Sequence, residues 1–536
     1  MTDYTARLMA FCVKSAHLEI IILLILIITG YIGLPELESN VHSISQPGRS
    51  SVALAEYVPH APITISNNTD LISQSWPGNG SVSDPYRIEA YEIVSAGGSC
   101  ISIEDTSLHI LISSCQLTSF SPNSGSGVTL QNVSNCVIDR CQITSLFTGV
   151  DIIQCNQGTN SITNNQILDN LDTGIDVNGV IEGIVIANNT VTNSEYGITL
   201  FHVFACTVTN NSLVNNGFVM SNNVFWTSRT GLFQDNSVNG KPLGIIEHVT
   251  NADIDVDFYG QLFLAHCENV TVRGGLFHNV SIGVTLEDSI NCTVSGTTAY
   301  WNTYGIGVYA SDNCTIEGSS LYENHRSGVF SSSALSIIIR NNDIFQNNHY
   351  PWNEYWEEHG LHLLNTHFAS VYNNTLHQNT IGVLLWDVSR SDIVNNTFSD
   401  NYEHGLILNT DSHNNTIYDN RFLRNSPNAE DSGYFNTWDD GVSEGNYWSD
   451  YDGVGYYEVL GSAGSVDRHP TGPPITTTTP TVTTTPTTTG TGTTTTTTGT
   501  TSDRNGELPS LDILLAIGGG ALVVIVLVII SKQKTR

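Results

Sequence analysis

Positive charge is scarce in this chain of 536 residues, which carries 18 Lys and Arg against 51 Asp and Glu for a formal net charge of −33. Nucleic acids are bound through basic surfaces that neutralise phosphates, so this composition argues against a nucleic-acid partner. It also leaves few positive groups for holding acidic polysaccharides. A solvated acidic surface of this kind is typical of extracellular or high-salt proteins.

Soft metal ligands are also sparse. The chain has three methionines, Met1, Met9 and Met220, and its ten cysteines show no Cys-x-x-Cys or Cys/His spacing. No metal and no cofactor are therefore expected. Cys292 and Cys314 share one phase of the repeat that dominates the chain. A disulfide or a soft-metal ladder is one interpretation, but we favour a row of small side chains that fill a buried layer.

A helical period is absent from the long central region, where a shorter phrase recurs instead. It reads Cys-Thr-Val-Ser-Gly at residues 292–296 and Cys-Thr-Ile-Glu-Gly at residues 314–318. The spacing between copies is 22 to 26 residues, with two larger steps of 39 and 32. A fixed period in this range predicts a solenoid. The copies begin at Ile110, Cys136, Asn160, Ile184, Cys206, Gly231, Val270, Cys292, Cys314, Ile337, Ala369, Ser391 and Asn415.

A second phrase in the same period, Gly-apolar-x-apolar, has the alternation of a strand with one buried face. Two or three such strands per period, joined by Asn, Gly and Ser turns, exclude leucine-rich and helical repeats. The sequence therefore predicts an all-β fold, a single-stranded parallel β-helix of about 13 coils over residues 106–433, roughly 60 Å long. The phrase begins at Gly127, Gly149, Gly174, Gly197, Gly283, Gly305, Gly360 and Gly405.

The N-terminal segment 1–55 is expected to be a signal peptide or signal anchor with a leader. Two basic residues precede an apolar run at 20–34, which is short for a full membrane span. Residues 56–105 and 434–470 are expected to cap the two ends of the β-helix, because an exposed solenoid end invites edge pairing.

The C-terminal region changes composition abruptly. Residues 471–510 are dominated by Thr with Pro and Gly, which predicts an extended, O-glycosylated stalk rather than a folded core. Residues 511–530 are apolar and long enough to form a transmembrane helix, and the basic tail 531–536 favours a cytoplasmic C-terminus. The sequence thus predicts a single-pass protein of the cell membrane with its β-helix outside the cell.

Asparagine fills two roles in the repeat. In the Asn-Asn turns it tolerates the left-handed conformation, and its amide can hydrogen-bond between coils. On an exported chain the Asn-x-Ser/Thr positions are also candidate glycosylation sites. Because several of these positions fall in the turns, some are expected to be buried ladder residues and only a fraction to be modified. The twelve candidates are Asn67, Asn79, Asn132, Asn188, Asn210, Asn269, Asn279, Asn291, Asn313, Asn373, Asn395 and Asn414.

Four short motifs carry a family resemblance. They are Trp-Pro-Gly-Asn-Gly-Ser at 76–81, Asp-Pro-Tyr-Arg-Ile-Glu at 84–89, Val-Asn-Gly-Lys-Pro-Leu at 238–243 and Gly-Asn-Tyr-Trp-Ser-Asp-Tyr at 445–451. With them, residues 61–470 resemble the NosD-type β-helix proteins, especially the archaeal cell-surface versions. The resemblance implies a right-handed parallel β-helix related to the carbohydrate-binding and sugar-hydrolase β-helix group. The founding members are periplasmic and linked to copper delivery, a function that fold alone does not transfer.

The chain departs from this family after residue 451. Relatives often continue with an Asp-Gly-rich, calcium-like loop, whereas here Asp452-Gly453 runs directly into Val454-Gly455-Tyr456. A calcium site is therefore not expected in this loop.

Two insertions interrupt the period, and loops on a rigid solenoid are where function tends to lie. The first, within 231–270, contains Asp253, Asp255 and Asp257. The second, between residues 328 and 360, places aromatic rings beside carboxylates, as a sugar-binding surface requires. The ligand-binding candidates there and on neighbouring coils are Tyr350, Trp352, Tyr355, Trp356, His359, His362 and His404.

The second insertion has three interpretations: glycan binding, catalysis, or a structural flap against the side of the rod. Catalysis by an inverting glycosidase needs two carboxyl groups about 6.5–9.5 Å apart, with Glu354, Glu357 or Glu358 as the acid. His359 and His404 are predicted to share a phase two coils apart, and His362 to point outward from its strand.

Two other acidic pairs have simpler interpretations. Asp439 and Asp440 faintly resemble the paired aspartates of polygalacturonases, but their place near the end of the solenoid predicts a role in the cap. Asp151 and Asp176 are predicted to project outward on adjacent coils, where an Asp on an acidic rod is expected to be solvated.

These patterns favour a non-enzymatic, membrane-tethered surface β-helix that serves adhesion, glycan binding or envelope structure. Its expected partners are the membrane, through the C-terminal helix, and surface glycans or envelope proteins. The alternative is a surface polysaccharide hydrolase or lyase, the lyase being the weaker variant. Copper handling is a third hypothesis, which rests on the family resemblance alone.

Overall fold

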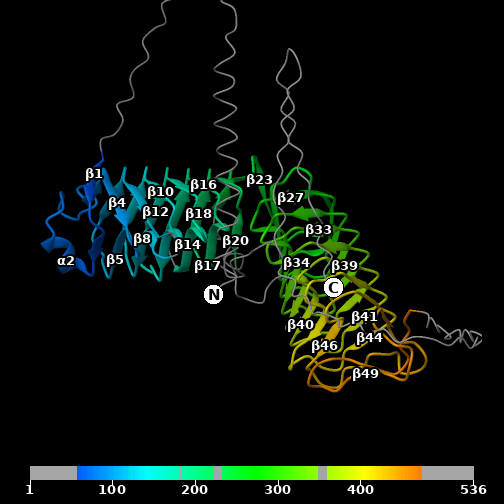
Figure 1. Cartoon of the computed structure of the whole chain (residues 1–536). Coiled ribbons are helices and arrows are strands. Elements are labelled where there is room, and N and C mark those ends of the chain that lie inside the picture. Colours follow the sequence, from blue (N-terminus) through cyan, green and yellow to red (C-terminus); the bar gives the residue numbers. More distant parts are fainter. Residues whose placement is uncertain (1–56, 122–123, 181–182, 221–231, 348–358, 474–536) are drawn as a thin grey trace, which may run out of the picture. The chain divides into compact units, whose positions relative to one another are not determined.

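A computed structural model describes residues 57–121, 124–180, 183–220, 232–347 and 359–473. All of them belong to one compact unit, Met1–Ile475. Their strands stack as the coils of a parallel β-helix (Figure 1). The helix has about 15 coils, more than the 13 copies of the repeat phrase, because β3(Tyr86–Glu89) and β24(Thr250–Asp255) each belong to a coil in which the phrase is absent.

Most coils contribute three strands, and each kind of strand stacks upon its own kind in successive coils. A hairpin at residues 239–240 divides the coils into a first run, which ends at residue 238, and a second run, which begins at residue 241. The strands of the Gly-apolar-x-apolar phrase form sheet I in the first run and sheet IV in the second. The strands of the Cys-Thr-Val phrase form sheets II and V, and the third strands form sheets III and VI. Within each run, neighbouring strands of a sheet pair in parallel, as Val128, Val150 and Ile175 do in sheet I.

Sheet I comprises β2(Ile63–Ile65), β5(Ile101–Glu104), β8(Ser126–Gln131), β11(Thr148–Ile153), β14(Thr173–Val180), β17(Tyr196–Val203) and β20(Phe218–Met220). Sheet II comprises β3(Tyr86–Glu89), β6(Ile110–Ser113), β9(Cys136–Asp139), β12(Asn160–Thr163), β15(Ile184–Ala187), β18(Cys206–Thr209) and β21(Leu232–Gln234). Sheet III comprises β1(Val58–His60), β4(Tyr91–Ser95), β7(Gln116–Ser119), β10(Gln142–Thr144), β13(Gln166–Leu168), β16(Thr190–Thr192), β19(Ser212–Val214) and β22(Ser237–Val238).

Sheet IV comprises β23(Lys241–Glu247), β25(Gln261–Ala265), β28(Ile282–Glu287), β31(Tyr304–Tyr309), β34(Ser327–Ser332), β37(His359–Leu364), β40(Ile381–Trp386), β43(His404–Leu408) and β46(Ala429–Asp431). Sheet V comprises β24(Thr250–Asp255), β26(Glu268–Arg273), β29(Thr293–Ser295), β32(Thr315–Glu317), β35(Ile338–Arg340), β38(Ser370–Tyr372), β41(Asp392–Val394) and β44(Thr416–Tyr418). Sheet VI comprises β27(Leu276–His278), β30(Thr298–Tyr300), β33(Ser320–Tyr322), β36(Asp343–Phe345), β39(Thr375–His377), β42(Thr397–Ser399), β45(Arg421–Leu423) and β47(Tyr447–Trp448). Helix α2(Asn68–Ser73) lies near the start, and β48(Tyr457–Glu458) pairs with β49(Val466–Asp467) near the end.

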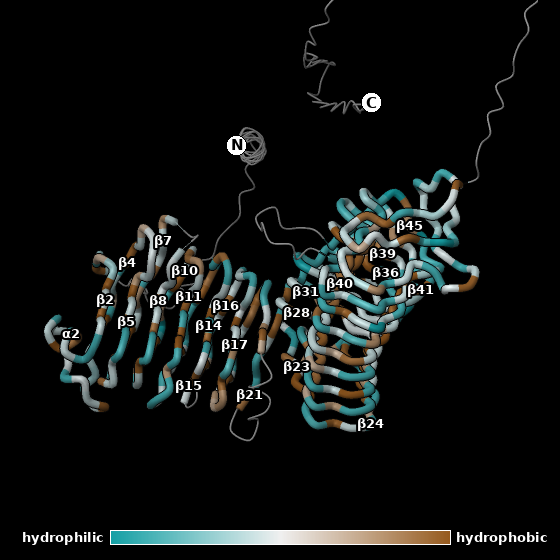
Figure 2. Tube along the Cα trace, turned by 90° about the horizontal axis from the view of Figure 1, so that it is seen from below, coloured by the Kyte–Doolittle hydropathy of each residue, from teal (hydrophilic) through white to brown (hydrophobic). Residues whose placement is uncertain are grey.

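The core follows from the alternation of each strand, which puts one side chain in two inside the coil. Hydrophobic and hydrophilic positions accordingly alternate along the coils in Figure 2. The nine cysteines from Cys100 to Cys314 are free and all buried. This confirms the interpretation of the Cys-Thr-Val phrase as a layer of small buried side chains, and burial raises the pKa of the Cys100 thiol to about 11.

The corners of each coil turn through residues with positive φ, which Asn and Gly adopt at low cost. We call the corner between sheets I and II, or IV and V, the first corner. The corner between sheets II and III, or V and VI, is the second corner. At the second corner an Asn-Asn pair divides its roles: Asn395 has φ +54° and is exposed, whereas Asn396 is fully buried.

The buried asparagines form ladders that run from coil to coil. Asn396 accepts hydrogen bonds from the backbone N–H and the Nδ2 of Asn374, both at 3.0 Å. Its own Nδ2 donates to the Val371 carbonyl at 2.8 Å and to Asn420 Oδ1 at 3.1 Å. Each rung thus satisfies backbone groups that the turn would otherwise leave unpaired.

The expectation that some glycosylation candidates are buried ladder residues is wrong. Eleven of the twelve are exposed and Asn279 is half-buried. In the Asn-Asn-Ser/Thr sequences of the coils the ladder residue is the second Asn, because the first occupies the left-handed corner and points away from the core. Asn189, Asn211, Asn374, Asn396 and Asn415 are these second residues, and all are buried.

The ladders end on carboxylates near residue 450, which explains the Gly-Asn-Tyr-Trp-Ser-Asp-Tyr motif. The last rung, Asn446, donates its backbone N–H to Asp467 Oδ2 at 2.7 Å, and Trp448 Nε1 donates to the same oxygen at 2.8 Å. A carboxylate suits this place because it only accepts hydrogen bonds and needs no further rung. Gly445 is required here, because a Cβ would collide with the Asp467 carboxylate.

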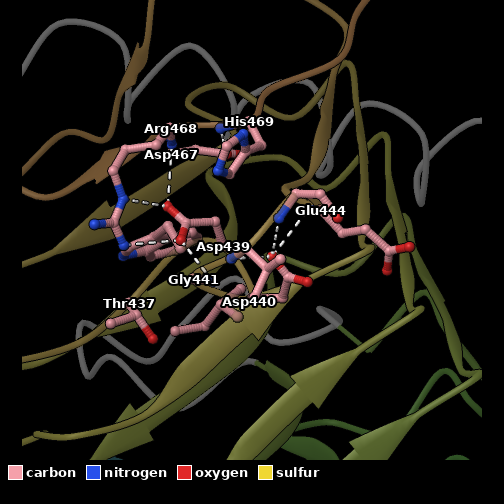
Figure 3. A network of polar contacts seen from close by, with 12 residues as sticks. Thr437, Asp439, Asp440, Gly441, Glu444, Asp467, Arg468 and His469 are labelled. Carbon is pink, nitrogen blue, oxygen red and sulfur yellow. Dashed lines mark hydrogen bonds and ion pairs between the residues drawn. The ribbon is translucent and has the colours of Figure 1, made fainter.

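Asp439 and Asp440 belong to this cap, as the sequence predicted (Figure 3). Asp439 binds Arg468 through two hydrogen bonds of 2.8 Å. Asp440 Oδ1 accepts the backbone N–H groups of residues 442, 443 and 444. Burial raises the pKa of Asp439, but the Arg468 guanidinium and backbone N–H groups outweigh it and lower the pKa; the backbone N–H donors lower the pKa of Asp440.

The two runs of coils are joined by a reversal of the chain. Strands β22 and β23 pair antiparallel, with Val238 opposite Lys241. The two turn residues, Asn239 and Gly240, both have positive φ, which is the geometry of a type I′ hairpin. The Asn-Gly-Lys-Pro motif is therefore the place where sheet III of the first run passes into sheet IV of the second.

Several sequence predictions lie outside the described residues: the signal segment 1–55, the stalk from residue 474, the transmembrane helix 511–530, the tail 531–536 and most of the aromatic insertion, residues 348–358. Among the residues that are described, no helix has the length and apolarity needed to cross a membrane.

Candidate ligand-binding cavity

The second run contacts the open edge of sheet I just after the hairpin. The buried side chain of Gln261 donates Nε2–H to the Phe218 carbonyl at 2.7 Å and accepts the Phe218 N–H on Oε1 at 2.8 Å. Gln261 thus takes the place of a neighbouring strand for β20. Ser281, which is also buried, accepts the Gly217 N–H at 3.2 Å. We call this contact region the junction.

A cavity of about 420 Å³ lies at the junction between the outer faces of β14, β17 and β20 and those of β28 and β31. Its volume falls within the range of roughly 300–1,000 Å³ typical of small-ligand pockets. The lining combines three carboxylates with aromatic rings. The lining residues are Asp172, Thr173, Asp176, Tyr196, Thr199, Phe201, Val219, Met220, Ile282, Glu287, Tyr304 and Tyr309.

The carboxyl groups on the sheet I side are held partly out of water. Burial raises the pKa of Asp172, and its charge adds to burial in raising the pKa of Asp176. Asp176 accepts a hydrogen bond from the Thr199 hydroxyl, and Asp172 Oδ2 accepts one from Thr173 at 3.0 Å. Protonated and ionised forms are therefore closer in free energy here than on the solvated surface.

One cation balances part of this charge. Arg326 Nε lies 3.3 Å from Glu195 Oε1, and its Nη1 lies 3.5 Å from the Tyr304 hydroxyl. The Arg326 charge lowers the pKa of Asp172 and of Glu195 against the larger effect of burial. The guanidinium thus ties the first run, through Glu195, to the second, and leaves the cavity with an excess of carboxyl groups.

Asp151 extends the acidic row by one coil, since it pairs with Asp176 across β11 and β14. Burial, followed by the charge of Asp176, raises its pKa from 3.8 to about 6. The expectation of a solvated surface pair at Asp151 and Asp176 is therefore wrong. Both carboxyls are partly covered, and Asp176 lines the cavity at the junction.

Asp151→Asn is expected to raise the melting temperature near pH 7.5 and to leave it unchanged near pH 4. In the folded chain Asp151 keeps its proton up to about pH 6, whereas in the unfolded chain it loses it near pH 4. The free energy of unfolding therefore falls as the pH rises through this window, and a neutral Asn escapes that loss.

Thermal unfolding at both pH values measures the effect. Asp392→Asn, on the exposed face of β41, is the control and should shift neither melting temperature. A gain for Asp151→Asn that is the same at pH 4 and pH 7.5 would contradict the assigned pKa.

Only the histidines among the predicted ligand-binding residues are described. His359 pairs with Ile381 and Ile381 with His404, so the predicted phase is confirmed. His404 Nε2 lies 3.3 Å from Glu430 Oε2. Tyr350, Trp352, Tyr355 and Trp356 lie outside the described residues, as do Glu354, Glu357 and Glu358.

His362 does point away from the core, but it is buried rather than exposed. It packs edge-on against Phe330 with ring centroids 5.2 Å apart, and Phe330 lies 5.7 Å from the Tyr309 ring. Burial lowers the pKa of His362 to about 4, so this imidazole is neutral at pH 7. The chain of rings continues the tyrosine wall of the cavity along the outer face of sheet IV.

The acidic residues of the first insertion have structural partners. Asp253 lies 3.2 Å from Arg273, and Asp257 accepts the Gly275 N–H at 3.0 Å. Asp253 and Asp255 are exposed on β24, the edge strand of sheet V, where charge discourages pairing with another chain.

An outer row of rings on sheet VI is a poor sugar platform. The rings stack face to face at 4.9 to 5.3 Å, so both faces of the three inner rings are already covered by their neighbours. This row stabilises the outside of the sheet, and its inner rings leave only their edges for a ligand. Its members are His278, Tyr300, Tyr322, Phe345 and His377.

The sequence patterns did not predict the cavity, because it lies between coils that are far apart in the chain. Tyr196 and Tyr304 are 108 positions apart in the sequence; both precede the Gly of the Gly-apolar-x-apolar phrase, but this shared phase does not show that their coils meet. One signal was present: Gln261 stands at the level of Gly283 of the next phrase, because Leu262 pairs with Val284. A buried polar side chain at that position marks a contact that the repeat itself does not need.

The fold defines a parallel β-helix repeat protein with a cavity on its side. Two family models match consecutive parts of the chain, the "Right handed beta helix region" over residues 78–238 and "Periplasmic copper-binding protein (NosD)" over residues 245–453. The boundary between the two matches falls on the Asn-Gly hairpin. The two matches and the parallel β-solenoid are consistent with a NosD-type β-helix repeat protein.

Solved structures of other proteins are similar at a lower level. The periplasmic alginate epimerase AlgG has 14% identity over 70% of this chain and 85% of its own, with a TM-score of 0.29. The A-module of the Azotobacter vinelandii mannuronan C-5 epimerase AlgE6 has 13% identity over 72% and 89%, with a TM-score of 0.26. The Dettilon tailspike protein has 12% identity over 72% and 63%, with a TM-score of 0.25. No curated protein sequence is significantly similar to this chain.

The family description names copper, and the described residues do not fit it. No three His, Cys, Asp or Glu side chains in these parts of the chain converge as a ligand set. The cysteines are buried within the coils, and Met220 is the one described methionine. Copper prefers several thiolate, thioether or imidazole ligands at one point, which these residues do not supply.

Proposed function

We propose that this chain is a surface β-helix protein that binds a neutral or positively charged saccharide in the junction cavity without cleaving it. The observation that carries the proposal is the placement of Tyr304 and Tyr309 opposite Asp172 and Asp176 in one space of ligand size. Sugar rings offer apolar faces to aromatic side chains and hydroxyl groups to carboxylates.

The charge of the cavity narrows the ligand class. Three carboxyl groups line the space, and the nearby Arg326 is paired with Glu195. An anionic polysaccharide would add negative charge to a site that already raises the pKa of its own acids. Neutral sugars or amino sugars satisfy the same acceptors without that repulsion.

Asp176→Asn and Tyr309→Phe are expected to weaken saccharide binding while the fold is kept. The loss of a hydrogen bond to a charged group predicts an affinity lower by roughly ten-fold or more for Asp176→Asn. The loss of one neutral hydroxyl predicts about three- to ten-fold for Tyr309→Phe. Full-length chain on an array of neutral, amino-sugar and uronic-acid glycans measures both.

Two matched controls keep this test specific. Asp392→Asn on β41 and Tyr300→Phe in the outer ring row of sheet VI should bind like the unaltered chain. Binding to uronic-acid polymers alone, or equal losses in the controls, would overturn the cavity assignment. Release of shortened sugars in the same assay would favour the rival function, a polysaccharide hydrolase or lyase.

We also propose that the cavity faces the outside of the cell, with the β-helix tethered through the stalk 471–510 and the apolar segment 511–530. The support is composition: a Thr-rich stretch, an apolar run of membrane length and a basic tail. Protease added to intact cells should remove the β-helix and leave a short C-terminal fragment in the membrane. Complete protection of the chain would contradict this placement.

A further inference from the structure

We propose that N-linked glycans are attached along the first and second corners of the β-helix, and that they leave the outer faces of sheets I and IV free. This modification is independent of saccharide binding in the cavity, but it does require export of the chain. The inference rests on where the coils place the asparagines of the twelve Asn-x-Ser/Thr sequences.

Accessibility separates these asparagines from the others in the repeat. At the first corner Asn269, Asn291 and Asn313 are exposed and have φ between +53° and +55°. At the second corner Asn373 and Asn395 are exposed with φ of +58° and +54°. The left-handed turn points each of these side chains away from the core.

A glycan on the first Asn of a pair leaves the ladder intact, because the ladder bonds are made by the second Asn. Asn395 Nδ2 makes one bond that a glycan would replace, to Asn373 Oδ1 at 2.7 Å on the surface. The repeat can therefore carry a glycan and a ladder rung on adjacent residues of one turn.

The acceptors form rows rather than isolated points. The Asn269 N–H donates to the Ile290 carbonyl and the Asn291 N–H to the Asp312 carbonyl, both at 3.0 Å. These bonds place Asn269, Asn291 and Asn313 above one another on consecutive coils, about 4.8 Å apart. Asn188 and Asn210 form a similar pair on the second corner of the first run.

The rows avoid the proposed ligand site. The cavity is lined mainly from strands of sheets I and IV, and none of the twelve asparagines lies on a strand of either sheet. Glycans on the corners would flank the cavity and shield the sides of the coils from proteases.

The chemistry is an ordinary group transfer at the side-chain amide. A bond forms between Asn Nδ2 and the anomeric carbon of an oligosaccharide carried on a lipid phosphate or pyrophosphate. The bond from that carbon to the phosphate oxygen breaks, the lipid phosphate leaves with the electron pair, and Nδ2 loses one proton.

The test is to express the full chain in a host whose export route carries N-glycosylation and to map its peptides by mass spectrometry. Enzymatic glycan release in heavy-oxygen water marks each modified Asn as a labelled Asp. We expect labels at the corner asparagines, including Asn291 and Asn313, in exported chain. Exported chain without corner labels would overturn the proposal, and so would chain that is never exported.

Thr293→Val gives the sharper readout. It removes the Asn291 acceptor sequence, while valine keeps the β-branched shape that β29 favours. The label at Asn291 should disappear, the label at Asn313 should remain, and the melting temperature of glycan-free chain should stay unchanged. Retention of a label at Asn291 would contradict modification through this sequence.

Discussion

Asn396→Ala is expected to lower the free energy of unfolding by about 3–5 kcal/mol. The substitution removes a fully buried amide that bridges three coils, and it leaves the Asn374 N–H and the Val371 carbonyl buried without their partners. Each orphaned buried group costs about 1–3 kcal/mol, and the lost rung at Asn420 adds to this. Urea unfolding of glycan-free chain, followed by far-UV circular dichroism, measures the change.

The neighbouring residue supplies the control. Asn395→Gly alters the exposed partner of the same pair, and Gly296 and Gly318 already occupy the equivalent second-corner place with positive φ. This variant should change the free energy of unfolding by less than about 1 kcal/mol. Equal losses for Asn395→Gly and Asn396→Ala would show that the two asparagines do not divide their roles as the structure indicates.

Gln261→Leu is expected to be nearly as damaging, at about 2–5 kcal/mol. Leucine matches the size of glutamine but cannot pair with the Phe218 N–H and carbonyl, which are buried at the edge of β20. Two backbone groups are then left without partners in an interior place. Because a solenoid can unfold in parts, the loss should appear first as an early transition in the first run of coils.

Limited proteolysis during heating locates that transition. Cleavage between β17 and β22 should begin at a lower temperature in Gln261→Leu than in the unaltered chain. Gln166→Leu, at an exposed position on β13, is the matched control and should unfold normally. Unchanged proteolysis of Gln261→Leu would mean that the glutamine does not hold the open edge of sheet I.

The repeat architecture could be predicted from sequence because it is a local property. The 22- to 26-residue period and the alternation around Gly149 or Gly305 reflect packing between successive coils, and the same pattern recurs in each coil. The burial of the cysteines and the cap role of Asp439 followed from the same regularity. Stacked coils leave few alternatives for residues at one phase of the repeat.

The roles of the paired asparagines were harder to assign. Composition shows that Asn suits both a left-handed corner and a ladder, but which member of the pair takes which role depends on φ at each position. Asn188, with φ +58°, is outside, and Asn189 is inside. An expectation drawn from the residue type alone therefore assigned burial to the wrong asparagine of the pair.

The candidate site could not be predicted from local sequence patterns. The outward position of Asp151 and Asp176 was predictable from the strand period, but the cavity that Asp176 lines is completed by β28 and β31, more than 100 residues later. The Asn-Gly turn at 239–240 signals a hairpin, yet it does not reveal which faces meet after it. Tertiary contact between distant coils determines both the cavity and its shifted pKa values.

A crystal structure of the chain with its best-binding oligosaccharide tests the central claim most directly. The account predicts sugar density in the junction cavity, with a ring against Tyr304 or Tyr309 and hydroxyl groups within hydrogen-bond distance of Asp172 or Asp176. Density bound only elsewhere, on the ring row of sheet VI or on the cap, with the cavity free of sugar, would contradict it.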